Sequence, residues 1–355
     1  AAAEAGIQPI ICRQERVGVG IADGYSRINR GSPPGVFAMQ YGPGAENAYP
    51  GVATAYSDSV PMLLLPLGHV RGRDRVFPHF SSVESFSSIT KYVEQINEAE
   101  NTVETMRRAF HKLKNGRPGP VMVEIPADLA QEEITDEKLS SYTPAVKALS
   151  SADEREVTRA AELLLSSEAP LIYAGQGVIY ADATEELSEL AELIQVPVTT
   201  TMAGKGAMDE RHDLSLGSSS GVMNGAVLHY LRNADTILAL GTSLTKHGMV
   251  TAIPSGKKII HATNNPEDFG NYYTPDIALL GDAKLILRQL IESCLDLLST
   301  RQNLESPIDD IYAIKQQWWN EWSTKLESTE VPMTPYRVIH EFMKLSDPSQ
   351  TIVTH

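Results

Sequence analysis

Glu15 is the residue of this chain whose setting points most directly to chemistry. It follows a short apolar run at residues 9–12, which predicts a buried strand, and it precedes a glycine-spaced helical pattern at residues 17–27. In open α/β sheets, ligands bind beyond the carboxyl ends of the strands, so a carboxylate at that point is a candidate for binding or catalysis. The alternative is a solvated loop residue or a neighbour of a helix N-cap.

A glycine-rich turn follows the next predicted strand. Residues 35–39 are apolar, and Gly42, Pro43 and Gly44 then lead into a helical pattern that includes Asn47. Glycines in a strand-to-helix turn let the backbone come close to a ligand. This turn is therefore a second candidate binding segment.

Six short motifs follow one another along the first part of the chain. Each is weak evidence alone, but together, in this order and spacing, they are specific. The motifs are Arg13-Gln14-Glu15, Gly18 with Gly24-Tyr25-Ser26-Arg27, Gly42-Pro43-Gly44-Ala45-Glu46-Asn47, Asp58-Ser59-Val60-Pro61-Met62, Ser88-Ile89-Thr90-Lys91 and Gly116-Arg117-Pro118-Gly119-Pro120-Val121. The series resembles the pyrimidine-binding domain of thiamine-diphosphate enzymes, and within these the acetohydroxyacid synthase and pyruvate oxidase group.

The resemblance implies roles for both candidate segments. Glu15 would be the catalytic acid that holds the proton on the ring nitrogen of thiamine diphosphate, and Gly42, Pro43, Gly44 and Asn47 would contact the aminopyrimidine. The cofactor's own amino group can remove the thiazolium C2 proton only when that ring nitrogen is protonated. An acid in a dry, apolar pocket suits this task, because desolvation raises its pKa.

The same resemblance places the diphosphate and Mg²⁺ on another domain, which carries a Gly-Asp-Gly…Asn motif. The nearest match here is Gly281-Asp282-Ala283, and no Asn follows it at the required distance. We therefore expect no metal ligand in this chain and no activity from it alone. Because the family pairs the pyrimidine domain of one subunit with the diphosphate domain of its neighbour, a homodimer or homotetramer is implied.

Residues 68–80 form a loop that is unusually cationic for an acidic protein. A solvated surface loop is the default interpretation. In the resembling family this loop lies over the active site, so His69, His79 and the loop's arginines are candidates to meet a substrate carboxylate. Acetohydroxyacid synthases carry Phe-Gln-Glu where this chain has Phe77-Pro78-His79, which changes the substrate side of the site.

The second half of the chain predicts another doubly wound unit. Its segments at residues 200–206, 214–217, 234–241 and 280–282 resemble the family's central domain, which holds FAD in many members. Predicted strands lie at residues 170–174, 196–200, 236–240, 258–261 and 277–280, and predicted helices at 157–165, 184–194, 225–232 and 284–298.

The resemblance makes Arg117 and Gly241 possible FAD contacts. Arg117 has an alternative role as a helix-to-strand turn residue. Where FAD-binding members usually have an acidic Asp-x-Asp-Pro-like turn, residues 263–266 read Thr-Asn-Asn-Pro, and residues 217–221 also depart from the family pattern. The turn at residues 175–177 lacks the third glycine of an NAD fingerprint.

Composition limits the classes of binding partner that the chain is expected to have. The formal net charge of -15 argues against nucleic acid or an anionic membrane, because both would repel the chain. Cys12, in the predicted buried strand, and Cys294 form neither a disulfide framework nor a metal motif, which favours a reducing, cytoplasmic setting. We also expect no membrane-spanning segment. The expected small-molecule partner is a 2-oxo acid.

These observations predict an α/β protein with two doubly wound parallel-sheet domains, a pyrimidine domain and a Rossmann-like central domain. Residues 1–6 read as the second half of a helix, Thr334 and Pro335 as the start of another, and residues 351–355 as a lone strand that needs a further domain. Three tryptophans, Trp318, Trp319 and Trp322, read as a packing stripe. The expected divisions are an N-terminally truncated pyrimidine-binding domain at 1–130, a linker at 131–153, the central domain at 154–300, a helical linker at 301–332 and the truncated start of a diphosphate-binding domain at 333–355.

Three functions remain open on this evidence. The first is a thiamine-diphosphate lyase or transferase, similar to acetolactate synthase, that decarboxylates a 2-oxo acid and passes the acyl carbanion to an acceptor. The second is a flavin-dependent 2-oxo acid oxidase of the same fold. The third is a noncatalytic module with a family-like fold, against which the presence of Glu15 argues.

Overall fold

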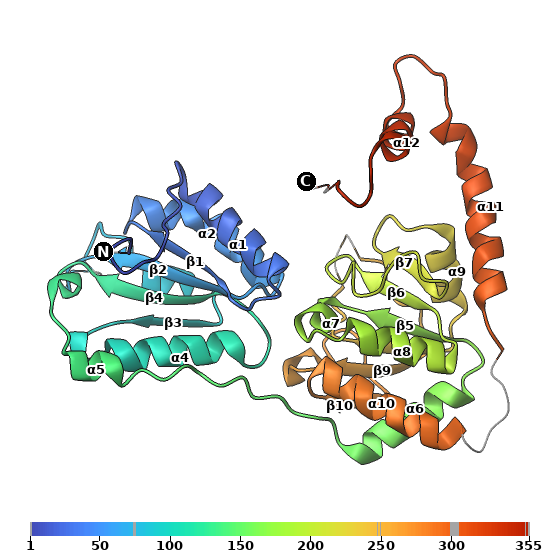
Figure 1. The fold of residues 1–355 in the computed structure, drawn as a ribbon, viewed down its shortest axis with the longest axis horizontal. Helices are drawn as coiled ribbons and strands as arrows, with labels where there is room; N and C mark the ends of the chain where they lie inside the picture. Colours follow the sequence, from blue (N-terminus) through green and yellow to red (C-terminus); the bar gives the residue numbers. More distant parts are fainter. Residues whose placement is uncertain are drawn as a thin grey trace. The chain divides into compact units, whose positions relative to one another are not determined.

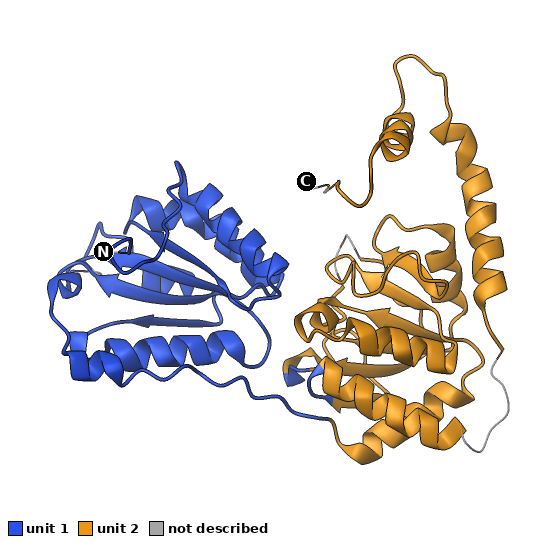
Figure 2. Ribbon diagram, viewed as in Figure 1, with its two compact units in different colours: residues 1–151, 264–266, 280–282 blue, residues 152–263, 267–279, 283–355 orange. Residues whose placement is uncertain are grey.

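The computed structural model of this chain describes residues 2–73, 76–246, 248, 250–298, 305–351 and 353. They form two compact units (Figure 2). Unit 1 comprises Ala1–Ser151 with the short pieces Asn264–Pro266 and Leu280–Asp282, and unit 2 comprises Ala152–Thr263, Glu267–Leu279 and Ala283–His355.

Unit 1 is a four-stranded parallel sheet with the strand order β1-β2-β4-β3. Helices α1 and α2 cover one face of the sheet, and α4 covers the other (Figure 1). The strands are β1 (Gly35–Met39), β2 (Met62–Gly68), β3 (Tyr92–Gln95) and β4 (Val121–Pro126), and the helices are α1 (Glu15–Ile28), α2 (Pro43–Ser57), α3 (Ser82–Phe86), α4 (Thr102–Lys114) and α5 (Asp136–Ser140).

The core of unit 1 follows from strand alternation. Neighbouring residues of a strand point to opposite faces, so Leu64 packs with Val52 of α2 while Leu63 packs with Leu113 of α4. Both leucines are buried, as expected for a strand covered on both faces. The sheet therefore supports α1 and α2 rigidly, and these two helices carry the candidate site.

Three expectations for unit 1 are wrong or incomplete. Residues 9–12 form no strand, and Ile10 and Ile11 are 72% and 93% exposed, because no described strand pairs with them. Residues 2–6 form turns instead of a helix, and the sequence did not reveal β3 or α3. Cys12 is accordingly only partly buried.

Unit 2 is a six-stranded parallel sheet in the order β10-β9-β8-β5-β6-β7. From β5 the chain adds strands first on one side and then on the other, which creates a topological switch point between β5 and β8. The strands are β5 (Pro170–Ala174), β6 (Val198–Thr201), β7 (Ser215–Ser219), β8 (Thr236–Leu240), β9 (Lys258–Thr263) and β10 (Ile277–Leu280).

The helices of unit 2 match the expected pattern closely. The predicted strands and helices of this region are found with small shifts at their ends, whereas β7 and α7 were not predicted. The helices are α6 (Glu154–Ser166), α7 (Gln176–Tyr180), α8 (Thr184–Ile194), α9 (Gly225–Asn233), α10 (Ala283–Leu298), α11 (Ile308–Leu326) and α12 (Pro335–Leu345). The α/β fold class with two parallel sheets is confirmed.

The tryptophan stripe is a packing feature, as predicted. Trp318 of α11 lies over Gly225 of α9, where a Cβ would come within 2.9 Å of its ring, and Trp322 meets Tyr336 of α12 edge to face. Helix α12 begins as expected, because the Thr334 side chain accepts from the Arg337 backbone N–H. In the expected strand at 351–355, residues 352, 354 and 355 lie outside the described residues.

Among the described residues, no helix is both long enough and apolar enough to cross a membrane.

Two glycines of unit 1 offer a matched test of this packing. A Cβ on Gly35 would lie 2.1 Å from the Ala22 carbonyl oxygen, whereas a Cβ on Gly20 would meet nothing within 4 Å. Gly35→Ala should therefore lower the free energy of unfolding by roughly 1–3 kcal/mol or more, because the α1 backbone must shift. Gly20→Ala should raise it by about 1 kcal/mol through helix propensity. Urea denaturation followed by circular dichroism checks both, and a tolerated Gly35→Ala would contradict the α1–β1 packing.

Candidate functional site

Glu15 is the first residue of α1, directly after the extended N-cap residue Gln14. Its Oε2 accepts a hydrogen bond of 2.7 Å from the side-chain amide of Asn47, in the first turns of α2. The alternative interpretation, a neighbour of a helix N-cap, therefore describes its local position. The contact with Asn47 goes further, because it ties the starts of two helices to each other.

The glycine turn is shaped to receive this carboxylate. Gly42 has φ 59° and ψ −115°, a left-handed conformation that favours glycine, and Pro43 opens α2. A Cβ on Gly44 would lie 3.0 Å from the Gln40 Cβ and 3.3 Å from Glu15 Oε1. The missing side chain at Gly44 thus lets the carboxylate approach the start of α2. The structure brings together Glu15, Gly42, Pro43, Gly44 and Asn47.

The electrostatics of Glu15 differ from expectation. The pKa of its carboxyl lies below the ordinary value, first because of the Asn47 hydrogen bond and second because of its own backbone N–H, while partial burial opposes both. We expected a dry pocket that raises this pKa. The physical reason for the difference is that residues 9–12 form no strand, which leaves the carboxylate at an open helix start.

Three aromatic rings line up beside the turn. Tyr41, which precedes Gly42, lies 4.7 Å from the His69 ring, and His69 stacks on His79 at 4.2 Å with the ring planes 19° apart. His79 Nδ1 is 2.9 Å from the Arg73 carbonyl oxygen. A carbonyl can only accept, so Nδ1 carries the proton and Nε2 of a neutral His79 can accept. Sequence reasoning missed Tyr41, although its place before Gly42 was a usable signal.

Arg71, one of the arginines of the loop, has another task in the structure. Arg71 bonds Asp128 through both its backbone and its guanidinium, and it also pairs with Glu132. It therefore anchors the start of the loop to the end of β4 instead of facing a substrate. Arg75, which follows Arg71 and Arg73 in this loop, lies outside the described residues.

Several motif residues hold the scaffold together. The buried Ser26 hydroxyl donates to the Pro61 carbonyl and accepts from the Gly35 N–H, which joins α1 to the starts of β1 and β2. Arg27 pairs with Asp23 on its own helix and with Asp58 at the end of α2. These contacts give physical reasons for the Gly-Tyr-Ser-Arg and Asp-Ser-Val-Pro motifs.

Lys91, the last residue of the Ser-Ile-Thr-Lys motif, closes the carboxyl end of α4. Its ammonium donates to the carbonyl oxygens of Lys112, at 2.6 Å, and Asn115. Burial lowers the pKa of Lys91 to about 8, and the nearby charge of Lys112 adds to this. The motif therefore has a structural role in this chain.

Comparison with known protein families assigns two parts of the chain to domains of one family. Residues 1–84 match the N-terminal TPP binding domain of thiamine pyrophosphate enzymes, and residues 157–290 match the central domain of these enzymes. The chain belongs to the thiamine pyrophosphate enzyme family.

Curated relatives of this chain in the thiamine pyrophosphate enzyme family include acetolactate synthases. A probable acetolactate synthase large subunit of Methanocaldococcus jannaschii is 33% identical over 346 residues, which cover 95% of this chain and 57% of the relative. The acetolactate synthase isozyme 3 large subunit of Escherichia coli is 29% identical over 364 residues, or 96% of this chain and 60% of the relative. The chain thus spans less than two thirds of their length.

The two possible FAD contacts lie in different units, and each has a local partner. In unit 1, Arg117 Nε donates to the Ser59 hydroxyl at 2.8 Å. In unit 2, Gly241 has φ 62°, and a Cβ there would lie 2.8 Å from the Val178 nitrogen and 2.9 Å from the Gly177 Cα. Gly241 therefore packs the loop after β8 against α7, at the switch point of the sheet. FAD binding stays a prediction.

A buried acid near the atypical turn escaped the sequence analysis. The Asp268 carboxylate is 2.8 Å from the Thr263 hydroxyl, and His261 Nε2 donates to the Thr242 carbonyl at 2.8 Å. Burial lowers the pKa of His261. The turn at 263–266 lacks the expected acid, but the fold supplies one five residues after Thr263. Only tertiary structure reveals its position.

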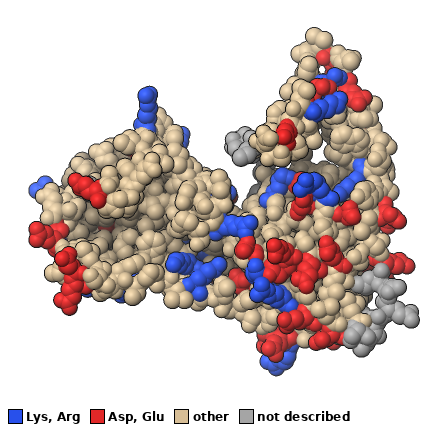
Figure 3. Space-filling model, in the orientation of Figure 1, with Lys and Arg blue, Asp and Glu red and all other residues tan. Residues whose placement is uncertain are grey.

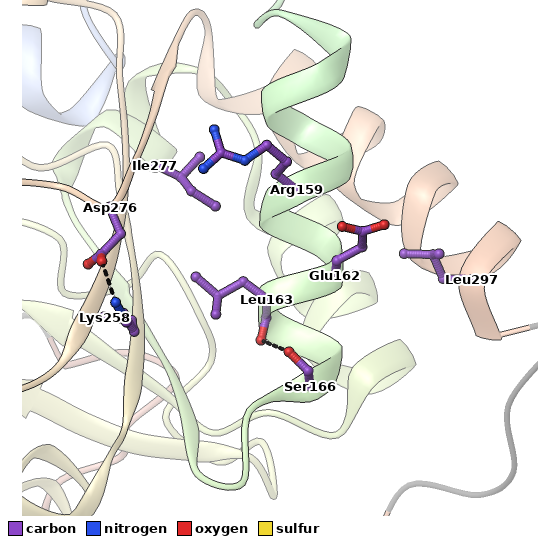
Figure 4. Close-up of a pocket in the computed structure, with 8 residues that line it drawn as sticks. All are labelled: Arg159, Glu162, Leu163, Ser166, Lys258, Asp276, Ile277 and Leu297. Atoms are coloured by element: carbon purple, nitrogen blue, oxygen red, sulfur yellow. Dashed lines mark hydrogen bonds and ion pairs between the residues drawn. The ribbon is translucent and has the colours of Figure 1, made fainter.

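One groove in unit 2, of about 560 Å³, has no evident role (Figure 4). Lys258 and Asp276, on its wall, pair with each other at 2.8 Å. Lys258 and Ile277 are the first residues of β9 and β10, so the groove lies at the amino ends of these strands. Ligands in open α/β sheets bind at the other edge. Throughout the residues with described positions, no three His, Cys, Asp or Glu side chains are placed to hold a metal.

The Asn47–Glu15 bond can be tested by titration. Asn47→Ala removes the largest cause of the lowered pKa, so the pKa of Glu15 should rise toward 4.5. Because folding lowers this pKa, the bond stabilises the fold above pH 4.5 and loses its effect as pH falls through the folded value. Carboxyl ¹³C NMR checks this, with Asn29→Ala at the far end of α1 as the control. An unchanged Glu15 titration would contradict the geometry.

Lys91 offers a second titration. Its side-chain NMR signal should titrate at about 8, and Lys112→Gln should raise this pKa, because one of its two causes is removed. Since folding lowers the pKa from 10.5, the unfolded chain binds more protons between about pH 8 and 10.5, and the fold gains stability as pH rises through that window. A Lys91 signal that titrates like free lysine would show that its ammonium does not cap α4.

Proposed function

We propose that this chain is part of an enzyme that uses thiamine diphosphate to decarboxylate a 2-oxo acid and to transfer the acyl unit to an acceptor, as an acetolactate synthase-like carboligase. One observation carries the proposal. A carboxylate at the start of α1 lies against a glycine turn at the start of α2, in a chain that belongs to the thiamine pyrophosphate enzyme family. The names of the curated relatives support the reaction class.

The residues of the turn fit the aminopyrimidine of thiamine diphosphate. Bound there, the cofactor would supply a nucleophilic carbon that attacks the 2-oxo group. Glu15, ionised because its pKa is lowered, would accept a hydrogen bond from the protonated ring nitrogen and so hold that proton on the ring. The Asn47 amide holds the carboxylate in place, and the bare backbone at Gly42 and Gly44 leaves room for a flat ring.

The stacked imidazoles supply the substrate side of the proposal. His69 and His79 lie in a row with Tyr41, so they stand next to the turn that would hold the cofactor. Protonated imidazoles bind carboxylates well through their N–H groups, and Arg71 is already paired elsewhere. Because Nδ1–H of His79 donates to the Arg73 carbonyl oxygen, His79 would bind the carboxylate through Nε2–H of its imidazolium form. We assign the carboxylate of the 2-oxo acid to His69 and His79. Mg²⁺ and the diphosphate would be held outside this chain.

A flavin-dependent oxidase is the second candidate. The observation that favours it is the switch point between β5 and β8, where Gly177 and Gly241 bring two loops together and where doubly wound sheets bind nucleotides. In that case Gly241 would contact FAD. A yellow, flavin-like absorption spectrum and reoxidation by oxygen or a quinone would support this candidate.

Self-association completes the proposal. We propose a homodimer or homotetramer, with a small 2-oxo acid as the substrate and with neither nucleic acid nor membrane as a partner. The net charge of -15 supports the last point, because phosphate-rich surfaces would repel the chain.

Glu15→Gln tests the proposed role of the carboxylate. The neutral amide cannot stabilise the positive charge of the protonated ring nitrogen, so turnover of a 2-oxo acid by the assembled enzyme should fall by roughly 10²- to 10⁴-fold or more. CO₂ release with a panel of 2-oxo acids measures this, and calorimetric titration of thiamine diphosphate with Mg²⁺ measures binding.

Glu46→Gln is the matched control, because Glu46 lies exposed in the first turn of α2 and near the same turn. Near wild-type turnover in Glu15→Gln would rule out the proposed role. A chain that binds no thiamine diphosphate in any assembly would favour the noncatalytic module.

A further inference from the structure

Tyr41 is a residue beside the glycine turn to which the proposed function gives no task of its own. It directly precedes Gly42, the N-cap residue of α2, and it is 38% exposed. Its ring lies 4.7 Å from the ring of His69, which stacks on His79 at 4.2 Å. We call Tyr41, His69 and His79 the ring column. The column leads from the turn proposed for the cofactor to the imidazoles proposed for the substrate carboxylate.

The register of the unit 1 sheet sets the position of two of these rings. Strands β1 and β2 are parallel neighbours, with Met39 beside Pro66. Tyr41 follows Met39 by two residues and His69 follows Pro66 by three, so both rings stand at the carboxyl ends of adjacent strands. Neighbouring strands lie about 4.8 Å apart, which is close to the distance between the two rings. The contact between Tyr41 and His69 therefore follows from the pairing of β1 with β2.

The third ring is held from the loop that follows β2. The His79 backbone N–H donates to the Val76 carbonyl oxygen at 2.9 Å, and its Nδ1–H donates to the Arg73 carbonyl oxygen. The next residue, Phe80, packs against the core under α1 and α2. The loop thus presents the His79 ring to His69 in one orientation, and the ring column is formed within a single chain.

The spacing of the column limits how a substrate can approach it. Separations of 4.2 and 4.7 Å are contact distances for aromatic rings, so both faces of the His69 ring are covered and no flat molecule fits between the rings. A 2-oxo acid would therefore meet the edges of the imidazoles, where their N–H groups lie. Its carboxyl carbon is bonded directly to the carbon that the cofactor would attack. With the carboxylate at the imidazoles and that carbon near the turn, the side chain of the acid lies beside Tyr41.

We propose that Tyr41 is a specificity-determining residue, because its ring limits the size of the side chain of the 2-oxo acid. This inference rests on the proposed function and names one determinant of its substrate class. The ring is apolar, so it favours contact with a small alkyl group. A branched or aromatic side chain needs the space that the ring fills, and forcing extra atoms into a packed site costs free energy. The sheet register and the start of α2 keep Tyr41 from moving aside.

A role of Tyr41 in support of His69 alone predicts a different result. Loss of such support lowers kcat/KM for every 2-oxo acid by the same factor, because the carboxylate is common to all of them. A limit on size changes the ratio of kcat/KM between a large and a small acid. This ratio therefore separates the two roles.

The test uses the assembled enzyme with pyruvate, whose side chain is a methyl group, and with its analogue that has an isobutyl side chain. Tyr41→Ala should raise the ratio of kcat/KM for the isobutyl acid to that for pyruvate by roughly 10-fold or more. Tyr41→Phe keeps the ring and should leave this ratio unchanged. Tyr56→Ala is the matched control and should also leave it unchanged, because Tyr56 is 46% exposed near the opposite end of α2.

A second measurement examines the column in the chain alone, without cofactor or turnover. An aromatic ring shifts the NMR signals of protons that lie over its face. Tyr41→Ala should therefore move the imidazole signals of His69, and Tyr41→Phe should leave them near their wild-type positions. Imidazole signals of His69 that are the same in Tyr41→Ala and the wild type would show that the rings are not in contact and would overturn the proposal.

An unchanged ratio in Tyr41→Ala would equally overturn it, as would a Tyr41→Phe variant that shifts the ratio as far as Tyr41→Ala, since the hydroxyl would then be responsible. An equal shift in Tyr56→Ala would also reject the assignment. If circular dichroism shows that Tyr41→Ala does not fold, Tyr41→Leu decides by the same ratio. A wild-type enzyme that consumes no 2-oxo acid would reject the proposed function together with this inference, whereas turnover with an unchanged ratio would reject the role of Tyr41 alone.

Discussion

The hydrogen bond from the Asn47 amide to the Glu15 carboxylate is the contact on which the rest of the site depends. It joins the first turns of α1 and α2, which pack on one face of the unit 1 sheet. Gly44 makes the bond possible, because a side chain there would crowd the carboxylate. The bond also favours the ionised form of Glu15, since it lowers the pKa of this carboxyl more than partial burial raises it.

Side-chain contacts around the unit 1 sheet keep the Asn47–Glu15 hydrogen bond in place. Ser26 and Arg27 tie α1 to neighbouring elements through Pro61 and Asp58, and Lys91 closes the end of α4 on the opposite face. The family motifs at residues 24–27, 58–62 and 88–91 thus have structural roles in this chain. The candidate site contains fewer residues than the motifs do. It consists of Glu15, the turn at Gly42 and the ring stack that begins at Tyr41.

The strands and helices that the sequence predicted correctly are those with a strong local signal. Apolar runs at β5, β8 and β10 predicted strands with correct ends, and the Thr334-Pro335 pair predicted the start of α12. Residues 9–12 had the same apolar signal and failed, because a strand also needs a neighbour to pair with. The strand β3 was missed for the opposite reason, since Tyr92–Gln95 ends in two polar residues and has no apolar run, and it gains its place by pairing with β4.

By itself the sequence determined the α/β class, the order of the motifs and the residues of the two turns, because spacing and residue type are local properties of the chain. Tertiary structure alone decided that Asn47 reaches Glu15, that Arg71 pairs with Asp128 while His69 stacks on His79, and that Glu15 has a lowered pKa. These are contacts between segments distant in sequence, and their distances and solvent exposure depend on how the helices pack on the sheet.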